Sequence, residues 1–290
     1  MAAGIARTRA RRSPLWVEAL IVAWLAWAYD RLTSLAPLRA HLALHHAWSI
    51  WHAEVALHLD PELALNRWLA HHHTLGEVAS YYYDNAHFIV TFGALAFLWW
   101  RRPDIYRPLR NSLALVNVLA FAVFWLYPLA PPRMLASVGF WDVVGHSNTF
   151  GQWHTGALAS SADQFAAMPS LHISWAVWSA LVLWRVASRR WVRVLAVLYP
   201  CLTAVVIFAT GNHFFFDALG GLAAIVVAVG LVEWVPRRLR ARSLQPTAAS
   251  AGELAPLPAR GANAPVPAVA TASVGDPGQA PTPSSSAALR

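Results

Sequence analysis

Three titratable side chains in this sequence lie at the edges of long apolar runs, where a membrane helix would leave lipid and meet water. His213 and Asp217 flank three consecutive phenylalanines, and His172 follows Met168-Pro169-Ser170-Leu171. Residues four apart share one face of a helix, so the Asp217 carboxylate can accept a hydrogen bond from one nitrogen of His213. The other nitrogen is then held unprotonated and more basic. We therefore predict a basic His213 oriented by Asp217, with His172 as the complementary acid.

The surroundings of Asp217 favour a functional pair over an ordinary exposed turn. Asp217 lies one turn inside an apolar run, where an ionisable group is costly and usually functional. Gly211 and Asn212 make the preceding turn short, and Gly220-Gly221 would let another helix approach closely. Both features would fix the geometry of the pair.

Two further segments suit a phosphate group. The Ser170 hydroxyl can accept a hydrogen bond from the exposed amides at the start of the apolar run from Pro169, and such amides also attract anions. Arg133 follows Pro131-Pro132, which hold the chain extended and present the planar guanidinium. An arginine that only reaches towards water at a membrane surface is equally common. We predict phosphate contacts from Arg133, Ser170 and Asn212.

The composition defines an all-α, polytopic membrane protein. Of 290 residues, 57% are hydrophobic and only 12% are charged, unlike a soluble domain. The formal net charge of +8 raises the question of nucleic-acid binding, but the arginines lie beside apolar runs, so no nucleic-acid partner is expected. The single cysteine, Cys201, excludes an internal disulfide.

The apolar runs predict a bundle of six membrane-spanning helices within four segments of chain. Residues 1–13 form a basic cytoplasmic N-terminus, 14–80 hold the first span and interfacial helices, 81–235 form the catalytic core, and 243–290 form a disordered Ala/Pro/Ser-rich tail. One interfacial helix should begin at Asp60-Pro61-Glu62 and reach Ala70. The six predicted spans cover about 15–29, 82–100, 113–129, 169–184, 194–210 and 214–235.

The arginines predict the orientation in a cell membrane. Four lie in each of the N-terminus, the 101–110 turn, the 185–193 turn and the 237–242 segment. Both termini are therefore expected in the cytoplasm. This places Arg133, His172, His213 and Asp217 together at the outer face.

Other clusters on the outer side receive simpler interpretations. The histidines at 45–46 and 71–73 lack the cysteines or paired carboxylates of a metal site, so we interpret them as wet interfacial segments. Residues Tyr81 to Tyr83 are assigned to the aromatic belt. For Asp84, Asn85 and His87 we expect a packing role, with the lining of a pocket as the alternative. The long loop from Ala130 to Met168 is the expected place for selection of an acceptor, and its candidate residues are Trp141, Asp142, Asn148, Trp153, Asp163 and Gln164.

With His172, His213 and Asp217 in place, the chain resembles the type 2 phosphatidic acid phosphatase superfamily, and within it the branch that includes inositol phosphorylceramide synthases. The likeness covers about residues 80–235 and rests on Pro169-Ser170-Leu171-His172 and on Gly211-Asn212-His213 through Asp217. It implies that His213 is a nucleophile forming a phosphohistidine, that Asp217 orients it, and that His172 protonates the leaving alkoxide. It also implies catalysis without a metal or other cofactor.

The chain departs from the usual signatures of that family at four positions. Leu126 and Met134 replace a lysine and a proline around Arg133, and Val206 and Ile207 replace a serine and an arginine ahead of His213. Of three cations that would normally face the phosphoryl group, only Arg133 remains. We therefore expect a substrate of lower charge, such as a phosphodiester.

The resulting hypothesis is an integral-membrane phosphoesterase or phosphotransferase that acts on a lipid-linked phosphate at the outer face. Its expected partners are a membrane lipid and, for a transferase, a polyol acceptor. Two alternatives stay open: a haem-binding electron carrier with His172 and His213 as axial ligands, and a proton-coupled transporter that relays protons through Asp217.

Overall fold

The described residues, 12–35, 39–147 and 165–243 of a computed structural model, form helices joined by short connections. This confirms the all-α class. Residues 1–11 and 244–290, which hold most of the predicted basic N-terminus and nearly all of the predicted tail, lie outside the described residues. The helices are α1 (Leu15–Leu35), α2 (Ala40–Ala56), α3 (Pro61–Ala70), α4 (His73–Arg101), α5 (Pro103–Leu126), the short 3₁₀ turns η2 (Pro132–Met134) and η3 (Ala136–Val138), α6 (Leu171–Val186), α7 (Arg190–Ala209) and α8 (Phe215–Ser243).

A long helix lies at each of the six places predicted for a membrane span. In the described part of the chain, three stretches are long and apolar enough to cross a membrane: α5, α7 and Phe215–Trp234 of α8. Helix α6 is apolar but shorter. The predicted total of six spans therefore stays a prediction, whereas insertion in a membrane is supported by the apolar helices themselves.

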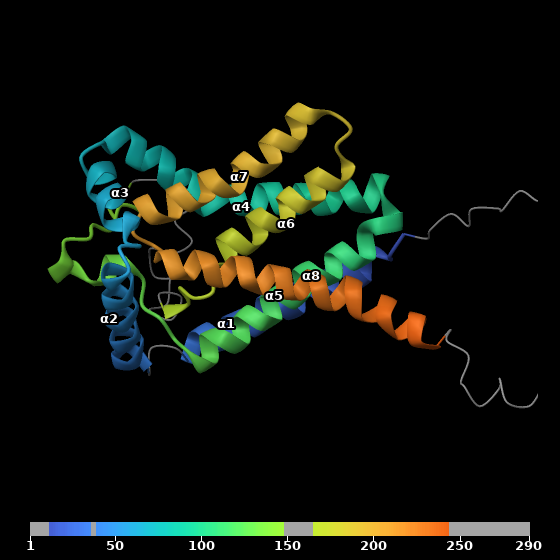
Figure 1. Cartoon of the computed structure of the whole chain (residues 1–290), viewed down its shortest axis with the longest axis horizontal. Helices are drawn as coiled ribbons and strands as arrows, with labels where there is room; N and C mark the ends of the chain where they lie inside the picture. Colours follow the sequence, from blue (N-terminus) through green and yellow to red (C-terminus); the bar gives the residue numbers. More distant parts are fainter. Residues whose placement is uncertain (1–11, 36–38, 148–164, 244–290) are drawn as a thin grey trace, which may run out of the picture. The chain divides into compact units, whose positions relative to one another are not determined.

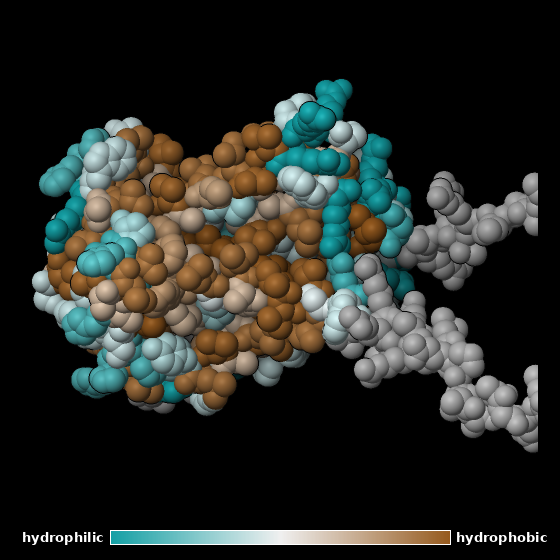
Figure 2. All heavy atoms as spheres, in the orientation of Figure 1, coloured by the Kyte–Doolittle hydropathy of each residue, from teal (hydrophilic) through white to brown (hydrophobic). Residues whose placement is uncertain are grey.

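The surface of the bundle agrees with a membrane setting. On the face shown in Figure 2, hydrophobic residues cover the middle of the bundle and hydrophilic residues gather towards its two ends. Leucine and valine side chains of α7 and α8 are exposed, among them Leu198, Leu202, Leu222 and Val226. Exposed apolar surface on this scale marks contact with lipid or with another protein.

Several helix boundaries differ from the predicted ones. Helix α4 begins at His73 rather than near Tyr82, because polar residues such as Ser80 continue the helix beyond the apolar run. Helix α5 begins at Pro103 rather than near Leu113, and a proline is well suited to the first helical position. The interfacial helix predicted from Pro61 to Ala70 is confirmed as α3.

The helices that carry the predicted site residues pack on one another. Helix α6 packs against α4, α7 and α8, and α5 packs against α8 (Figure 1). Helices α2 and α3 lie at the end of the bundle where α6 and α8 begin. At this end the chain after α5 pairs with the chain before α6, since Leu129 N–H donates to Phe165 O at 2.9 Å and Ala167 N–H donates to Leu129 O at 3.3 Å.

The first turns of α6 and α8 are in direct contact. Ser170 N–H donates to Asp217 O at 2.9 Å, and the Ser174 hydroxyl donates to Gly221 O at 2.9 Å. A Cβ atom added at Gly221 would lie 2.3 Å from Ser170 O, which is too close for two non-bonded atoms. The predicted close approach at this glycine is confirmed, and it fixes the segment after Met168 against the start of α8.

Candidate active site

His172, in the first turn of α6, and His213, in the turn before α8, lie close together. Their ring centroids lie 5.5 Å apart with an interplanar angle of 63°. Both rings line a cavity of about 240 Å³, which Arg133 and Asn212 also line. These four side chains, predicted from distant parts of the sequence, therefore share one small cavity.

The hydrogen bonds of His213 determine which of its nitrogens is free to react. Its Nδ1 lies 3.0 Å from Ala167 O and 3.4 Å from Asp217 Oδ2. A carbonyl oxygen can only accept, so Nδ1 donates, and in the neutral ring the lone pair is on Nε2. Nε2 is buried and has no hydrogen-bond partner among the described residues. In its neutral form the ring therefore has its free lone pair on the nitrogen that the protein leaves unbound.

This geometry corrects one sequence prediction about His213. The residue precedes α8, which begins at Phe215, so it does not share a helical face with Asp217. The shorter contact of Nδ1 is with Ala167 O, and the Asp217 carboxylate stands slightly farther away. The predicted contact between His213 and Asp217 is present, but it does not arise from helical spacing. The turn at Gly211, with its positive φ of 71°, leads the chain from α7 into α8 and places His213 there.

Asp217 is fully buried in the first turn of α8. Its Oδ2 accepts the Phe214 N–H at 2.9 Å. The start of a helix carries exposed amides and a partial positive charge, and both stabilise a carboxylate there. Asp217 is thus held beside Nδ1 of His213 by its own backbone.

The His172 ring is packed between aromatic side chains of α4. Tyr83 stacks on it at 4.3 Å, and His87 meets it edge-on, also at 4.3 Å. Tyr83 is buried, so its assignment to the aromatic belt is wrong, whereas Tyr81 is exposed. The spacing of Tyr83 and His87 by four residues was a usable signal that both face one side of α4.

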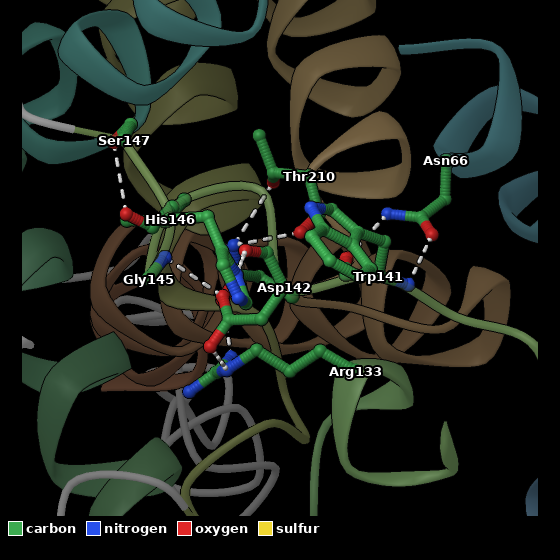
Figure 3. Close-up of polar contacts among 10 residues, drawn as sticks. Asn66, Arg133, Trp141, Asp142, Gly145, His146, Ser147 and Thr210 are labelled. Atoms are coloured by element: carbon green, nitrogen blue, oxygen red, sulfur yellow. Dashed lines mark hydrogen bonds and ion pairs between the residues drawn. The ribbon is translucent and has the colours of Figure 1, made fainter. Parts of the chain in front are cut away.

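Arg133 lies in η2 and is tied to the turn that carries His213. Its N–H donates to Gly211 O at 2.9 Å, and its Nη1 donates to Asn212 Oδ1. Its Nε lies 3.6 Å from Asp142 Oδ2 (Figure 3). The guanidinium and the Asn212 amide therefore lie together at the cavity, and their contact with a phosphate group stays a prediction.

Asp142 was assigned only to acceptor selection, yet it lines the cavity and faces Arg133. Its Oδ1 accepts the Gly145 N–H at 2.9 Å. The neighbouring Trp141 is held by Asn66 of α3, whose Oδ1 accepts the Trp141 N–H at 2.7 Å (Figure 3). No sequence signal marked Asn66. Of the other predicted acceptor-loop residues, Asn148, Trp153, Asp163 and Gln164 lie outside the described residues.

Ser170 serves the helix rather than the cavity. It is fully buried, and its hydroxyl oxygen accepts the Ile173 N–H as the N-cap of α6. Helix α6 therefore begins at Leu171, two residues after the predicted start of this span at residue 169. A phosphate contact from Ser170 stays a prediction.

The cavity has little positive charge. Val206 and Ile207 are buried within the apolar core of α7, where the resemblance would place a serine and an arginine. Among the described residues that line the cavity, Arg133 is the single arginine, and Asp142 offsets part of its charge.

A second, larger cavity adjoins the first. It measures about 550 Å³ and is bounded mostly by apolar side chains of α1, α4, α5 and α6. Tyr29, Leu171 and His172 line both cavities. Glu18 and Arg110, which form an ion pair at 3.5 Å, line the second cavity near the first residues of α1 and α5.

These features define a helical membrane protein with a polar, histidine-lined site beside an apolar cavity. The family model described as the PAP2 superfamily matches residues 48–231, and the chain belongs to this superfamily. Membership indicates a phosphatase or phosphotransferase. No curated protein and no solved structure matches the chain.

Proposed function

We propose that this protein cleaves a lipid-linked phosphoester through a phosphohistidine on His213. The observation that supports this most strongly is the buried Nε2 of His213, with its lone pair at a cavity that Arg133, Asn212 and His172 also line. A fixed nucleophile, a fixed cation and a second imidazole around one small space suit phosphoryl transfer.

The reaction proceeds in two displacements. In the first, Nε2 of His213 attacks phosphorus, the bond from phosphorus to the ester oxygen breaks, and His172 gives its proton to the leaving alkoxide. Arg133 and Asn212 stabilise the charge on the phosphoryl oxygens. In the second, water or an alcohol attacks phosphorus, its proton passes to His172, and the P–N bond breaks. Asp217 and Ala167 O hold the His213 ring throughout.

The adjoining apolar cavity supports a lipid substrate. It shares His172 with the polar cavity, so a phosphate at His213 would have its hydrocarbon tail directed among α1, α4, α5 and α6. A polar cavity of about 240 Å³ is smaller than the roughly 300–1,000 Å³ of pockets for drug-sized ligands. This size favours a phosphate group over a haem at the two histidines.

The low positive charge favours a phosphodiester or a partly neutralised lipid phosphate. One arginine facing an aspartate compensates a dianionic monoester poorly. A transfer of the inositol-phosphate type, with a polyol as the acceptor in the second step, is the reaction that we propose for this charge pattern. We place the active site at the outer face of the cell membrane, with both termini cytoplasmic, on the distribution of the arginines.

The experiment is a substrate comparison with purified protein in detergent. A lipid monophosphate and a phosphoinositide are supplied with and without a soluble polyol, and released phosphate and head-group transfer are measured separately. We expect turnover of the diester, and loss of turnover in His213→Ala. A folded His213→Ala variant with full activity would refute the proposal.

A further inference from the structure

Among the described residues, three carboxyl groups outside the predicted catalytic set are completely buried, and two of them belong to α2 and α3. Glu54 of α2 and Glu62 of α3 are both 0% exposed. Glu54 Oε1 accepts the Phe216 N–H at 2.6 Å, and Glu62 lies within hydrogen-bond reach of Glu54. Apart from that contact, Glu54 Oε2 and both oxygens of Glu62 find no donor in the described part of the chain. Two ionised carboxylates have only acceptors, so a contact between them requires a proton.

Burial favours such a proton on the pair. Burial and the neighbouring Glu62 carboxyl raise the pKa of Glu54 from 4.5 to about 10. Burial also raises the pKa of Glu62. Around neutral pH the two carboxyl groups can therefore hold one proton between them while Glu54 Oε1 accepts from Phe216.

The pair reaches the segment that carries the proposed nucleophile. Phe216 lies in the first turn of α8, between His213 and the Asp217 carboxylate. Phe214 N–H is bound by Asp217, and Phe216 N–H is bound by Glu54 from a different helix. Glu54 is thus a tertiary contact that holds the start of α8.

Several charged groups surround the pair. Asp217 lies close enough for its negative charge to raise the pKa of both glutamates, and Asp60 adds to the effect on Glu62. Helix α2 also packs against η2, which carries Arg133. One proton shared by Glu54 and Glu62 keeps the number of negative charges on these two groups and Asp217 at two rather than three.

We propose that Glu54 and Glu62 form a proton-sharing pair that positions the first turn of α8, and through it Asp217 and His213. The two glutamates are positioning residues, since neither lines the cavity. The catalytic role of the positioned residues, Asp217 and His213, rests on the proposed function. The shared proton of Glu54 and Glu62 does not depend on that function.

Infrared spectroscopy tests the proton without reference to activity. A protonated carboxyl group has a C=O band distinct from that of a carboxylate. We expect such a band in the wild-type protein at neutral pH, its disappearance near pH 10, and its loss in Glu54→Gln. An unchanged band in Glu54→Gln would refute the shared proton, even if the protein proved to have no phosphatase activity.

Thermal melting gives a second readout of the same proton. Because the pKa of Glu54 in the folded protein is raised above 4.5, this group favours the folded state fully below that pH, and the benefit is lost as the pH rises to about 10. The melting temperature of the wild type should fall across this window, and less steeply in Glu54→Gln. Equal slopes would contradict the assignment.

Enzyme kinetics tests the positioning. In Glu54→Gln the new amide would still accept from Phe216 and donate to Glu62, so kcat should stay within about threefold of wild type, and its alkaline decline should weaken. Glu54→Leu loses both bonds, and kcat should fall roughly 10- to 100-fold with little change in KM, the scale of a misplacement of about 1 Å.

Glu77→Gln, on the partly exposed Glu77 of α4, is the matched control. Wild-type kinetics in a folded Glu54→Leu protein would overturn the positioning role. If that variant does not fold, an activity in Glu54→Gln as low as in His213→Ala would overturn it.

Discussion

The rings of His172 and His213 lie 5.5 Å apart, centroid to centroid, at the wall of a shared cavity. One ring comes from the first turn of α6 and the other from the residues just before α8. The two elements are joined by backbone contacts, including the 2.9 Å hydrogen bond from Ser170 N–H to Asp217 O. The distance between the two imidazoles therefore depends on how closely α6 and α8 approach.

Gly221 should be indispensable for that approach. In Gly221→Ala the new Cβ would lie 2.3 Å from Ser170 O, so α6 and α8 must separate. We expect a loss of stability of about 1–3 kcal/mol, typical of overpacking, together with a marked fall in kcat.

Gly230→Ala is the control, because nothing lies within 4 Å of its added Cβ. It should leave activity unchanged and stabilise α8 by up to about 1 kcal/mol. Thermal melting and phosphate release measure both effects, and similar behaviour of the two variants would contradict this account.

Tyr83 should matter to the leaving-group step. In Tyr83→Leu, His172 loses the ring stacked on it at 4.3 Å. Such aromatic contacts contribute about 0.5–1.5 kcal/mol, so kcat for a lipid alkoxide should fall roughly 2- to 12-fold. A substrate with a nitrophenolate leaving group needs little acid assistance and should be affected much less. Tyr81→Leu, at an exposed position of the same helix, is the control. Equal losses on both substrates would show that the stacking does not act through His172.

Asp142 should tune the charge preference. Asp142→Asn removes the negative charge 3.6 Å from Arg133 and keeps an oxygen for the Gly145 N–H. We expect the ratio of kcat/KM for a dianionic monoester to that for a diester to rise about two- to fivefold, the scale of a partly exposed ion pair. Raising the salt concentration should reduce the difference. An unchanged ratio would remove Asp142 from substrate selection.

The apolar cavity should set the tail length of the substrate. Ala114 of α5 lines the cavity, so Ala114→Trp should obstruct it. Turnover of long-chain lipid phosphates should decrease, while a short-chain, water-soluble phosphoester is turned over as by wild type. Val118→Trp, on an exposed position of α5, is the matched control. A chain-length profile that is the same in all three proteins would place the tail elsewhere.

Hydropathy and the spacing of polar residues predicted much of this arrangement. The positions of the six helices follow from the apolar runs. Arg133, His172 and His213 were expected on one side because successive spans run in opposite directions, and each of these residues lies at a span end on the same side. The short turn at Gly211 and the close approach at Gly221 were also visible as glycines that permit such geometry.

The contacts that the sequence could not predict are tertiary. Ala167 O binds His213 through a backbone carbonyl, which carries no side-chain signature. Asn66 and Glu54 lie on helices far from the site in sequence, and their partners are backbone groups of Trp141 and Phe216. Helix starts were misplaced where polar residues extend a helix beyond its apolar run, as at His73.

Trapping the covalent intermediate tests the central claim most directly. Purified protein is mixed with a lipid substrate labelled at phosphorus, quenched within the first turnover, and digested so that the labelled peptide can be identified. We predict acid-labile label on His213, more of it in His172→Ala with a good leaving group, and none in His213→Ala. Label on another residue, or turnover with no label on His213, would contradict the mechanism.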